Sequence, residues 1–131
     1  MLRIEADAVA SLIDRVADDF VQAVELIFKC KGRVIVTGMG KSGHIAAKIA
    51  ATLTSTGTSA FFMHPAEGVH GDLGLVRKDD VVISISKSGT TGELTRLIPT
   101  LRKIGVPIIS LTGNLKSALA VRSDVVLNVG V

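Results

Sequence analysis

The residues Arg33-Val-Ile-Val-Thr-Gly-Met-Gly-Lys-Ser-Gly43 decide the fold of this chain. They join a short run of β-branched residues to a glycine-rich turn, and an amphipathic stretch rich in alanine follows directly. A strand that turns through glycines into a helix is typical of the first half of a βαβ unit. We therefore predict a strand at 33–37 and a helix at about 43–56, whose alanines permit close approach to a sheet.

The rest of the chain repeats this alternation of short apolar runs and longer amphipathic stretches. The other predicted strands are 59–62, 80–84, 107–111 and 124–129. The other predicted helices are a first long helix ending at about Lys29, one with a stripe from Leu94 to Ile104, and a short one at about 115–121. Because the strands are continuous apolar runs, helices should cover both faces of the sheet. We predict a doubly wound, flavodoxin-like α/β fold with five parallel strands in the order 2-1-3-4-5.

The length of 131 residues corresponds to one domain. We predict an N-terminal helix within residues 1–30 and a sheet core over residues 33–131. Both ends look cut, because no capping residue precedes the first helix and the chain stops just after a strand, where a covering helix is expected. The domain is therefore predicted to be C-terminally truncated.

The composition excludes several classes of protein. Hydrophobic residues make up 47% of the chain, which is enough to build a core and excludes intrinsic disorder. No apolar run approaches the ~18 residues of a membrane span, and the acidic residues near the start argue against a signal peptide. Cys30 is the single cysteine, which excludes a disulfide framework and favours a cytoplasmic location.

The charge is mildly positive, with fifteen Lys and Arg against twelve Asp and Glu. The basic residues are scattered, Trp and Tyr are absent, and Phe occurs four times. Proteins that bind single-stranded nucleic acid need aromatic platforms in a basic groove. We therefore expect no nucleic-acid partner and no membrane partner, and a small anionic ligand suits this charge.

Two loops are predicted to carry the chemistry. In a doubly wound sheet, a ligand binds at the carboxyl ends of the strands, where the winding direction reverses. With the predicted strand order this point lies between the first and third strands, which lead into the loops 38–43 and 84–93. Both loops are rich in glycine, hydroxyls and lysine, and both open a helix. Two adjacent helix N-termini present free N–H groups, which predicts a phosphate site.

Neither standard nucleotide motif fits the first loop. A dinucleotide fold needs an acidic residue about twenty residues after its glycines, and residues 59–64 contain no acid. A P-loop needs a glycine five residues before Gly40, where this chain has Ile35.

The second loop is a more specific phosphate signal. Ser86, Ser88 and Thr91 surround Gly89 at the start of a helix and offer neutral donors to a monophosphate. The structural alternative is that these residues form a turn and a helix cap. Thr90 would then form a capping box with Glu93.

The two loops together resemble those of the SIS (sugar isomerase) family, whose domains bind phosphosugars. The stretch His64-Pro-Ala-Glu-Gly-Val-His-Gly-Asp-Leu-Gly74 is similar to the signature of the D-arabinose 5-phosphate isomerases. The resemblance is clearest from Arg33 to Val131. One departure is Thr90, where many relatives have Glu.

This resemblance implies an aldose–ketose isomerase that interconverts D-ribulose 5-phosphate and D-arabinose 5-phosphate through an enediolate, for Kdo and lipopolysaccharide synthesis. Such a reaction needs a base, a proton donor and positive charge near the oxyanion, and no redox cofactor, so we expect no cofactor. The implied catalytic residues are Lys41, Glu93 and His70. The expected substrate-binding residues are Gly40, Ser42, Gly57, Thr58, His64, Ser86, Ser88 and Thr91.

The resemblance also bears on metals and partners. It implies an inhibitory zinc ion at His64, although one histidine is not a metal site by itself, and a catalytic metal is not expected. His44 opens a helix and is either a weak candidate for the site or a simple surface residue. Relatives form dimers or tetramers, so a homodimer or homotetramer is expected.

Family members continue with further active-site segments, and a tandem CBS pair often follows. We therefore expect this fragment to isomerise slowly or not at all. Two other functions are considered, a non-catalytic phosphosugar sensor and a purely structural oligomerisation domain. The combination of Lys41, His70 and Glu93 favours the enzyme, because a sensor needs only the phosphate loops.

Overall fold

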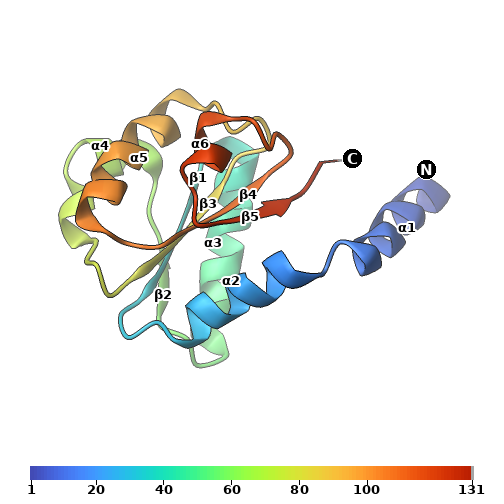
Figure 1. Ribbon diagram of the computed structural model, residues 1–131, viewed down its shortest axis with the longest axis horizontal. Coiled ribbons are helices and arrows are strands. Elements are labelled where there is room, and N and C mark those ends of the chain that lie inside the picture. Colours follow the sequence, from blue (N-terminus) through green and yellow to red (C-terminus); the bar gives the residue numbers. More distant parts are fainter. Residues whose placement is uncertain (131) are drawn as a thin grey trace.

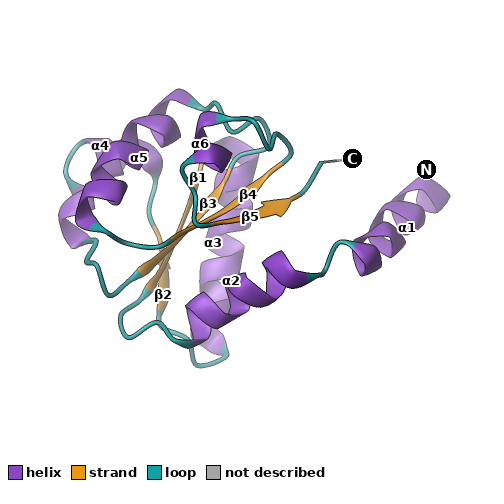
Figure 2. Cartoon of the chain, in the orientation of Figure 1, coloured by secondary structure: helices purple, strands orange, loops and turns teal. Residues whose placement is uncertain are grey.

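The computed structural model describes residues 1–130 and confirms the predicted α/β fold. Five strands form one parallel sheet in the order β2-β1-β3-β4-β5 (Figures 1 and 2). The strands are β1 (Val34–Gly38), β2 (Ala60–Phe62), β3 (Val81–Ile85), β4 (Ile108–Thr112) and β5 (Val125–Asn128). The helices are α1 (Leu2–Ala10), α2 (Asp18–Phe28), α3 (Gly40–Ser55), α4 (Pro65–Val69), α5 (Gly92–Ile104) and α6 (Ala118–Val121), with short 3-10 helices η1 (Ser11–Asp14) and η2 (Asp72–Leu75).

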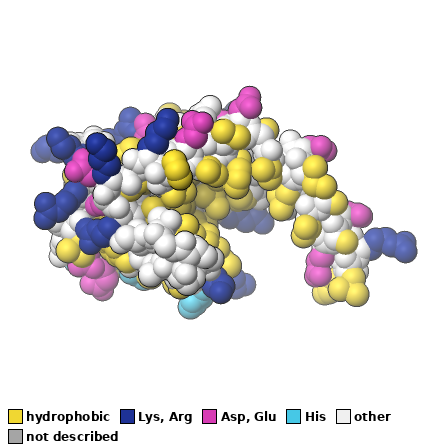
Figure 3. Space-filling model, turned by 90° about the horizontal axis from the view of Figure 1, so that it is seen from below, with side chains coloured by type: hydrophobic (Ala, Val, Ile, Leu, Met, Phe, Trp, Pro, Cys, Tyr) yellow, Lys and Arg dark blue, Asp and Glu magenta, His cyan; other side chains and the backbone are white. Residues whose placement is uncertain are grey.

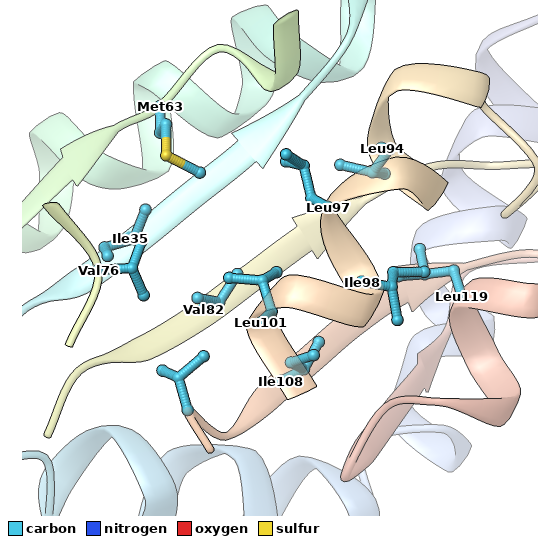
Figure 4. Close-up of a cluster of buried hydrophobic side chains, with 11 residues drawn as sticks. Ile35, Met63, Val76, Val82, Leu94, Leu97, Ile98, Leu101, Ile108 and Leu119 are labelled. Atoms are coloured by element: carbon cyan, nitrogen blue, oxygen red, sulfur yellow. The ribbon is translucent and has the colours of Figure 1, made fainter. Parts of the chain in front are cut away.

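Helices cover both faces of this sheet, which explains why the strands are apolar throughout. Successive side chains of a strand point to opposite faces, so in β1 Ile35 enters one core and its neighbours Val34 and Val36 enter the other. The first core packs β1, β3 and β4 against the predicted stripe of α5 (Figure 4). The second core packs the opposite face against α3, whose Ala46 and Ala50 are buried.

The prediction of one N-terminal helix over residues 1–30 is wrong. The chain leaves helical geometry after η1, and the backbone of Ala17 is not helical, with φ −122° and ψ −146°. Asp18 and Asp19 then open α2, where the helix dipole favours carboxylates. Within this break the Arg15 guanidinium donates to the carbonyl of Gly130. Residues 1–17, here called the arm, therefore project from the body beside the end of β5 (Figure 1).

Three other boundaries differ from the sequence prediction in ways that matter for the site. Helix α3 begins at Gly40 rather than at residue 43, so Lys41 and Ser42 lie in its first turn. The predicted loop after the second strand contains α4 and η2, because Pro65 at the first helical position favours a helix start. Helix α6 is confined to its last predicted turn.

None of the helices within residues 1–130 has the length and hydrophobicity that a membrane span requires.

Candidate functional site

A cleft lies at the carboxyl ends of β1 and β3, the point that the strand order predicts. It has a volume of about 540 Å³, and its walls come from the loops that open α3 and α5. Four predicted binding residues, Ser42, Ser86, Ser88 and Thr91, line it together with Met39, Ile85 and Lys87. Because Gly38 and Ile85 are register partners on neighbouring strands, both loops start side by side.

The first turn of α3 packs closely against the backbone at the end of β1, and this contact places the start of α3 at the cleft. A Cβ atom at Gly43 would lie only 2.7 Å from the carbonyl oxygen of Gly38, so glycine is needed where the helix folds back over β1. Lys41 is exposed in the first turn of α3 and forms no salt bridge with any described residue. Its charge therefore remains available at the N-terminus of the helix, where an anion is favoured.

The loop after β3 is braced by its own hydroxyl groups. The Ser86 hydroxyl is buried, accepts from the Gly89 N–H at 3.0 Å and lies 3.0 Å from the Thr91 hydroxyl. The Ser88 hydroxyl accepts from the N–H of Thr90 at 3.2 Å and from its hydroxyl at 3.1 Å. The loop is thus held in shape before a ligand arrives, which lowers the entropy cost of binding.

The capping box of Thr90 with Glu93, which was the structural alternative for this loop, does not form. The residue that precedes α5 is Thr91, whose side chain caps no helix N–H, and the Thr90 hydroxyl bonds to Ser88 instead. Glu93 is half-buried in the first turn of α5, without the structural role that the box would have given it.

The histidines lie on the segment after β2 and on α3. His64 accepts from the Ala66 N–H at 3.1 Å through Nδ1 and so caps α4, a role that the sequence analysis missed. His70 is exposed directly after α4, and His44 is exposed in α3. Among residues 1–130, no group of three or more potential ligands is placed to hold a metal ion. An inhibitory zinc ion at His64 therefore stays a prediction.

Gly57 and Thr58 do not lie in the cleft. They precede β2, at the amino edge of the sheet, and line a separate hollow of about 510 Å³ with residues of α2 such as Val24 and Phe28. Parallel strands place their starts and their ends at opposite edges, so one chain does not bring these two residues to a ligand held by the loops after β1 and β3.

Lys87 and Met39 line the cleft but were not among the predicted site residues. Lys87 lies between Ser86 and Ser88, is exposed, and forms no salt bridge with a described residue. Its position inside the serine-rich loop is the signal that would have identified it. Lys87 gives the cleft one uncompensated positive charge, and Lys41, which is not a lining residue, carries a second one next to the lining residue Ser42 in the first turn of α3.

A row of buried hydroxyl groups lies below the cleft. Thr37 pairs in register with Ser84, and Ser84 pairs with Ser110, so the three side chains stand at one level across β1, β3 and β4. They are at most 2% exposed, and none of their hydroxyls bonds to a described residue. Two positions further along the chain, on the same face, Ser86 follows β3 and Thr112 ends β4.

Comparisons with known proteins agree with this geometry. Residues 26–130 match the sequence model of the SIS domain. The arabinose 5-phosphate isomerase KdsD of Pseudomonas aeruginosa is 55% identical over 128 residues, which cover 98% of this chain and 39% of that protein. KdsD of Escherichia coli K12 is 51% identical over 131 residues, covering 100% of this chain and 40% of that protein. The chain thus spans about two fifths of the length of these curated relatives.

A solved structure shares the fold closely. E. coli CFT073 c3406 in complex with arabinose 5-phosphate superimposes with a TM-score of 0.93 at 45% identity, over 99% of this chain and 69% of that chain. The resemblance to arabinose 5-phosphate isomerases on which the sequence analysis relied is confirmed by these matches.

Proposed function

The chain belongs to the SIS domain family, and from this premise we propose that it is the phosphosugar-binding domain of an enzyme that interconverts D-ribulose 5-phosphate and D-arabinose 5-phosphate. The single observation that carries the proposal is the cleft between two braced loops at the start of α3 and α5. The KdsD relatives are named for this activity, and the neighbouring structure contains arabinose 5-phosphate. The product would feed Kdo and lipopolysaccharide synthesis.

The phosphate group binds at the loop after β3. The hydroxyls of Ser88 and Thr91, the first N–H groups of α5 and the charge of Lys87 surround the same space. The first N–H groups of a helix have no partner within it, so they are free to donate to an anion. Ser42 faces this space from α3, so it contributes a hydroxyl from the opposite wall.

The isomerisation moves one proton between the two carbon atoms at the end of the sugar. A base removes the proton next to the carbonyl group, an enediolate forms, and the proton returns to the neighbouring carbon while a hydroxyl proton moves to the other oxygen. No electrons leave the sugar. Glu93 is our candidate for the base, Lys41 stabilises the oxyanion, and His70 assists ring opening.

Binding tests the first half of the proposal. The chain is titrated with D-arabinose 5-phosphate and with D-arabinose in a calorimeter. We expect binding of the phosphorylated sugar and none of the free sugar, because the loops recognise phosphate. Equal binding of both sugars, or of neither, contradicts a phosphosugar site.

Proton exchange tests the second half and separates an enzyme from a sensor. At stoichiometric protein in D₂O, ribulose 5-phosphate should gain deuterium at C1, and Glu93→Gln should slow this exchange by about 100-fold or more. Arabinose 5-phosphate affinity of Glu93→Gln serves as the control for binding. Because the fragment is expected to isomerise slowly or not at all, the same measurement is made on a longer chain that contains this domain, and phosphosugar binding without exchange in that longer chain would favour the sensor.

The rate of the chain should fall below that of its longer relatives. The chain spans about two fifths of their length, and we propose that the remainder contributes further active-site residues. A coupled assay beside P. aeruginosa KdsD measures this difference. Equal turnover numbers contradict it.

We further propose that the domain acts in the cytoplasm as a homodimer or homotetramer in which a second copy covers the arm. No residue of α1 is buried, and hydrophobic side chains lie along the arm and α2 (Figure 3). Residues 1–19 carry five acidic and two basic residues, whereas the remainder carries thirteen basic and seven acidic residues. The acidic arm of one copy is thus complementary in charge to the body of another.

Sedimentation measures this assembly. Val9→Asp places a charge on the apolar face of the arm, where Val9 is 67% exposed, and it should yield monomers. Ser11→Asp provides a control at an exposed polar position. A parent chain that is monomeric at about 100 μM contradicts the assembly.

A further inference from the structure

The loop that follows β4 lies directly behind the phosphate loop that follows β3. Two groups converge on the carbonyl oxygen of Lys87 from this second loop: the Gly113 N–H donates at 2.9 Å and the Thr112 hydroxyl at 3.3 Å. The Thr112 side chain is 0% exposed, so it does not touch a ligand in the cleft. Its contact with the phosphate loop is therefore made entirely from behind.

Both hydrogen-bonding capacities of the Thr112 hydroxyl are used. It donates its proton to Lys87 and accepts from the N–H of Asn114 at 3.3 Å. The neighbouring turn also packs closely against this region, because a Cβ atom at Gly89 would lie 2.0 Å from the Ser117 hydroxyl oxygen and 3.0 Å from that of Thr112. Gly89 has φ +68°, a conformation that glycine adopts without steric cost. The backbone of the phosphate loop thus packs against the side chains of Ser117 and Thr112, and Thr112 bonds to it through the Lys87 carbonyl.

The two hydrogen bonds to the Lys87 carbonyl also fix the direction of the Ser88 N–H, which belongs to the same peptide group. In a trans peptide the carbonyl of one residue and the N–H of the next point in opposite directions. A Lys87 carbonyl directed back toward β4 therefore directs the Ser88 N–H forward, to the side where Lys87 and Ser88 line the cleft. Among residues 1–130, the Ser88 N–H donates to no protein group.

We infer that Thr112 is a positioning residue, which orients the Ser88 N–H as a donor to the phosphate group through the Lys87 peptide. This inference rests on the proposed function, because it presumes that the phosphate binds at this loop. Thr112 acts on affinity without contacting the ligand. The specificity of the loop for an anion is set in part by the neighbouring strand.

The experiment compares Thr112→Val, which keeps the shape of the side chain, with Thr112→Ser, which keeps the hydroxyl. Each variant of the 131-residue chain is titrated calorimetrically with inorganic phosphate and with D-arabinose 5-phosphate. We expect Thr112→Val to raise the Kd for both ligands by about fivefold or more. We expect the Kd values of Thr112→Ser to lie within about twofold of the parent values. Thermal unfolding of the ligand-free variants is measured in parallel.

The amide resonance of Ser88 provides a readout that a loss of stability alone would not change. In the parent chain it should be among the resonances that phosphate shifts most, and in Thr112→Val this shift should shrink while that of Thr91 persists. The parent measurement stands even if Thr112→Val does not fold. An unshifted Ser88 amide in a parent chain that binds phosphate overturns the inference.

The outcomes separate the two proposals. A parent chain that binds neither ligand removes the proposed function and this inference with it. A parent chain that binds both, with a Thr112→Val variant of equal affinity, overturns only the role of Thr112. Weakened binding in both Thr112→Val and Thr112→Ser also overturns it, because the hydroxyl would then not be the group that matters.

Discussion

The two edges of the sheet use their polar groups in opposite ways. At the amino edge, the buried carboxylate of Asp80 accepts from the N–H groups of Arg33 at 2.7 Å and Arg77 at 2.8 Å. Asp124 accepts from the Ile108 N–H at 2.8 Å and from the Arg102 guanidinium at 3.0 Å. Both carboxylates are therefore hydrogen-bonded to donors of the chain itself.

At the carboxyl edge, two lysines and one backbone N–H have no bonding partner among residues 1–130. Lys41 and Lys87 form no salt bridge with a described residue, and the Ser88 N–H has no protein acceptor among residues 1–130. The hydroxyls there brace the loop rather than the sheet. The difference indicates that polar groups at the amino edge stabilise the fold, whereas those at the carboxyl edge are available to the ligand that we propose. Substitutions at the two edges should therefore separate stability from binding.

The largest effect is expected at Asp80. Asp80→Ala removes a buried carboxylate that accepts from two backbone N–H groups. Because these donors lose their acceptor, the free energy of unfolding should fall by about 3 kcal/mol. Urea denaturation measures this change. Asp79→Ala, at the exposed neighbouring position, should change the stability by less than about 0.5 kcal/mol. Equal losses in both variants would show that the Asp80 bonds do not stabilise the edge.

A smaller effect is expected on binding at the opposite edge. Lys87→Met removes one positive charge beside the proposed phosphate and should raise the Kd for D-arabinose 5-phosphate by about tenfold. Its free energy of unfolding should stay within about 0.5 kcal/mol of the parent value. Lys78→Met, which removes an exposed charge at the amino edge, is the matched control. If both variants bind equally well, the cleft is not the anion site.

Removing a buried hydroxyl below the cleft is predicted to raise the free energy of unfolding, in contrast to the loss expected at Asp80. Thr37→Val replaces a hydroxyl that no described residue bonds by a methyl group of similar size, and it should raise the free energy of unfolding by up to about 1 kcal/mol. Thr112→Val, where the hydroxyl is paired, should lower it. A loss of stability in Thr37→Val would instead show that a buried water molecule satisfies this hydroxyl.

The smallest effect concerns Cys30 at the amino edge. Burial raises the pKa of this thiol above its ordinary value, with the nearby carboxylates of Asp80 and Asp79 acting in the same direction. The folded protein then resists ionisation of the thiol, so its contribution to stability is complete below the pKa of the unfolded thiol. That contribution is lost as the pH rises through the higher pKa of the folded state.

Denaturation of the parent chain and of Cys30→Ala between about pH 8 and about pH 10 measures this loss. The parent chain should lose slightly more stability over this range. Identical slopes in the two proteins would show that Cys30 does not contribute, and the chain has no tyrosine to obscure the comparison.

The body of the fold was predicted well because its signals are strong and local. The stripe of α5 is buried as its spacing predicts, and the five apolar runs form the five strands in the predicted order. The arm was predicted poorly because an apolar helical pattern does not reveal which surface will cover it. The capping box failed because α5 begins one residue later than the box requires, so Thr91 and not Thr90 precedes the helix, and the Thr90 hydroxyl bonds to Ser88.

The site was predicted in part for a similar reason. Ser42, Ser86, Ser88 and Thr91 were identified because they belong to two loops that the strand order brings together. Gly57 and Thr58 were predicted together with them, and the structure places these two residues at the other edge.

The order of the elements, the coverage of both faces of the sheet and the two glycine-rich loops follow from the sequence by itself, because each depends on residues within a few positions of one another. Only the tertiary structure decided which groups meet across strands. Thr112 and Lys87 lie 25 positions apart, and no local sequence pattern around either residue predicts their hydrogen bond. It exists because β3 and β4 pair in a register that puts Ile85 beside Leu111. Contacts of this kind depend on strand pairing, which a local pattern does not encode.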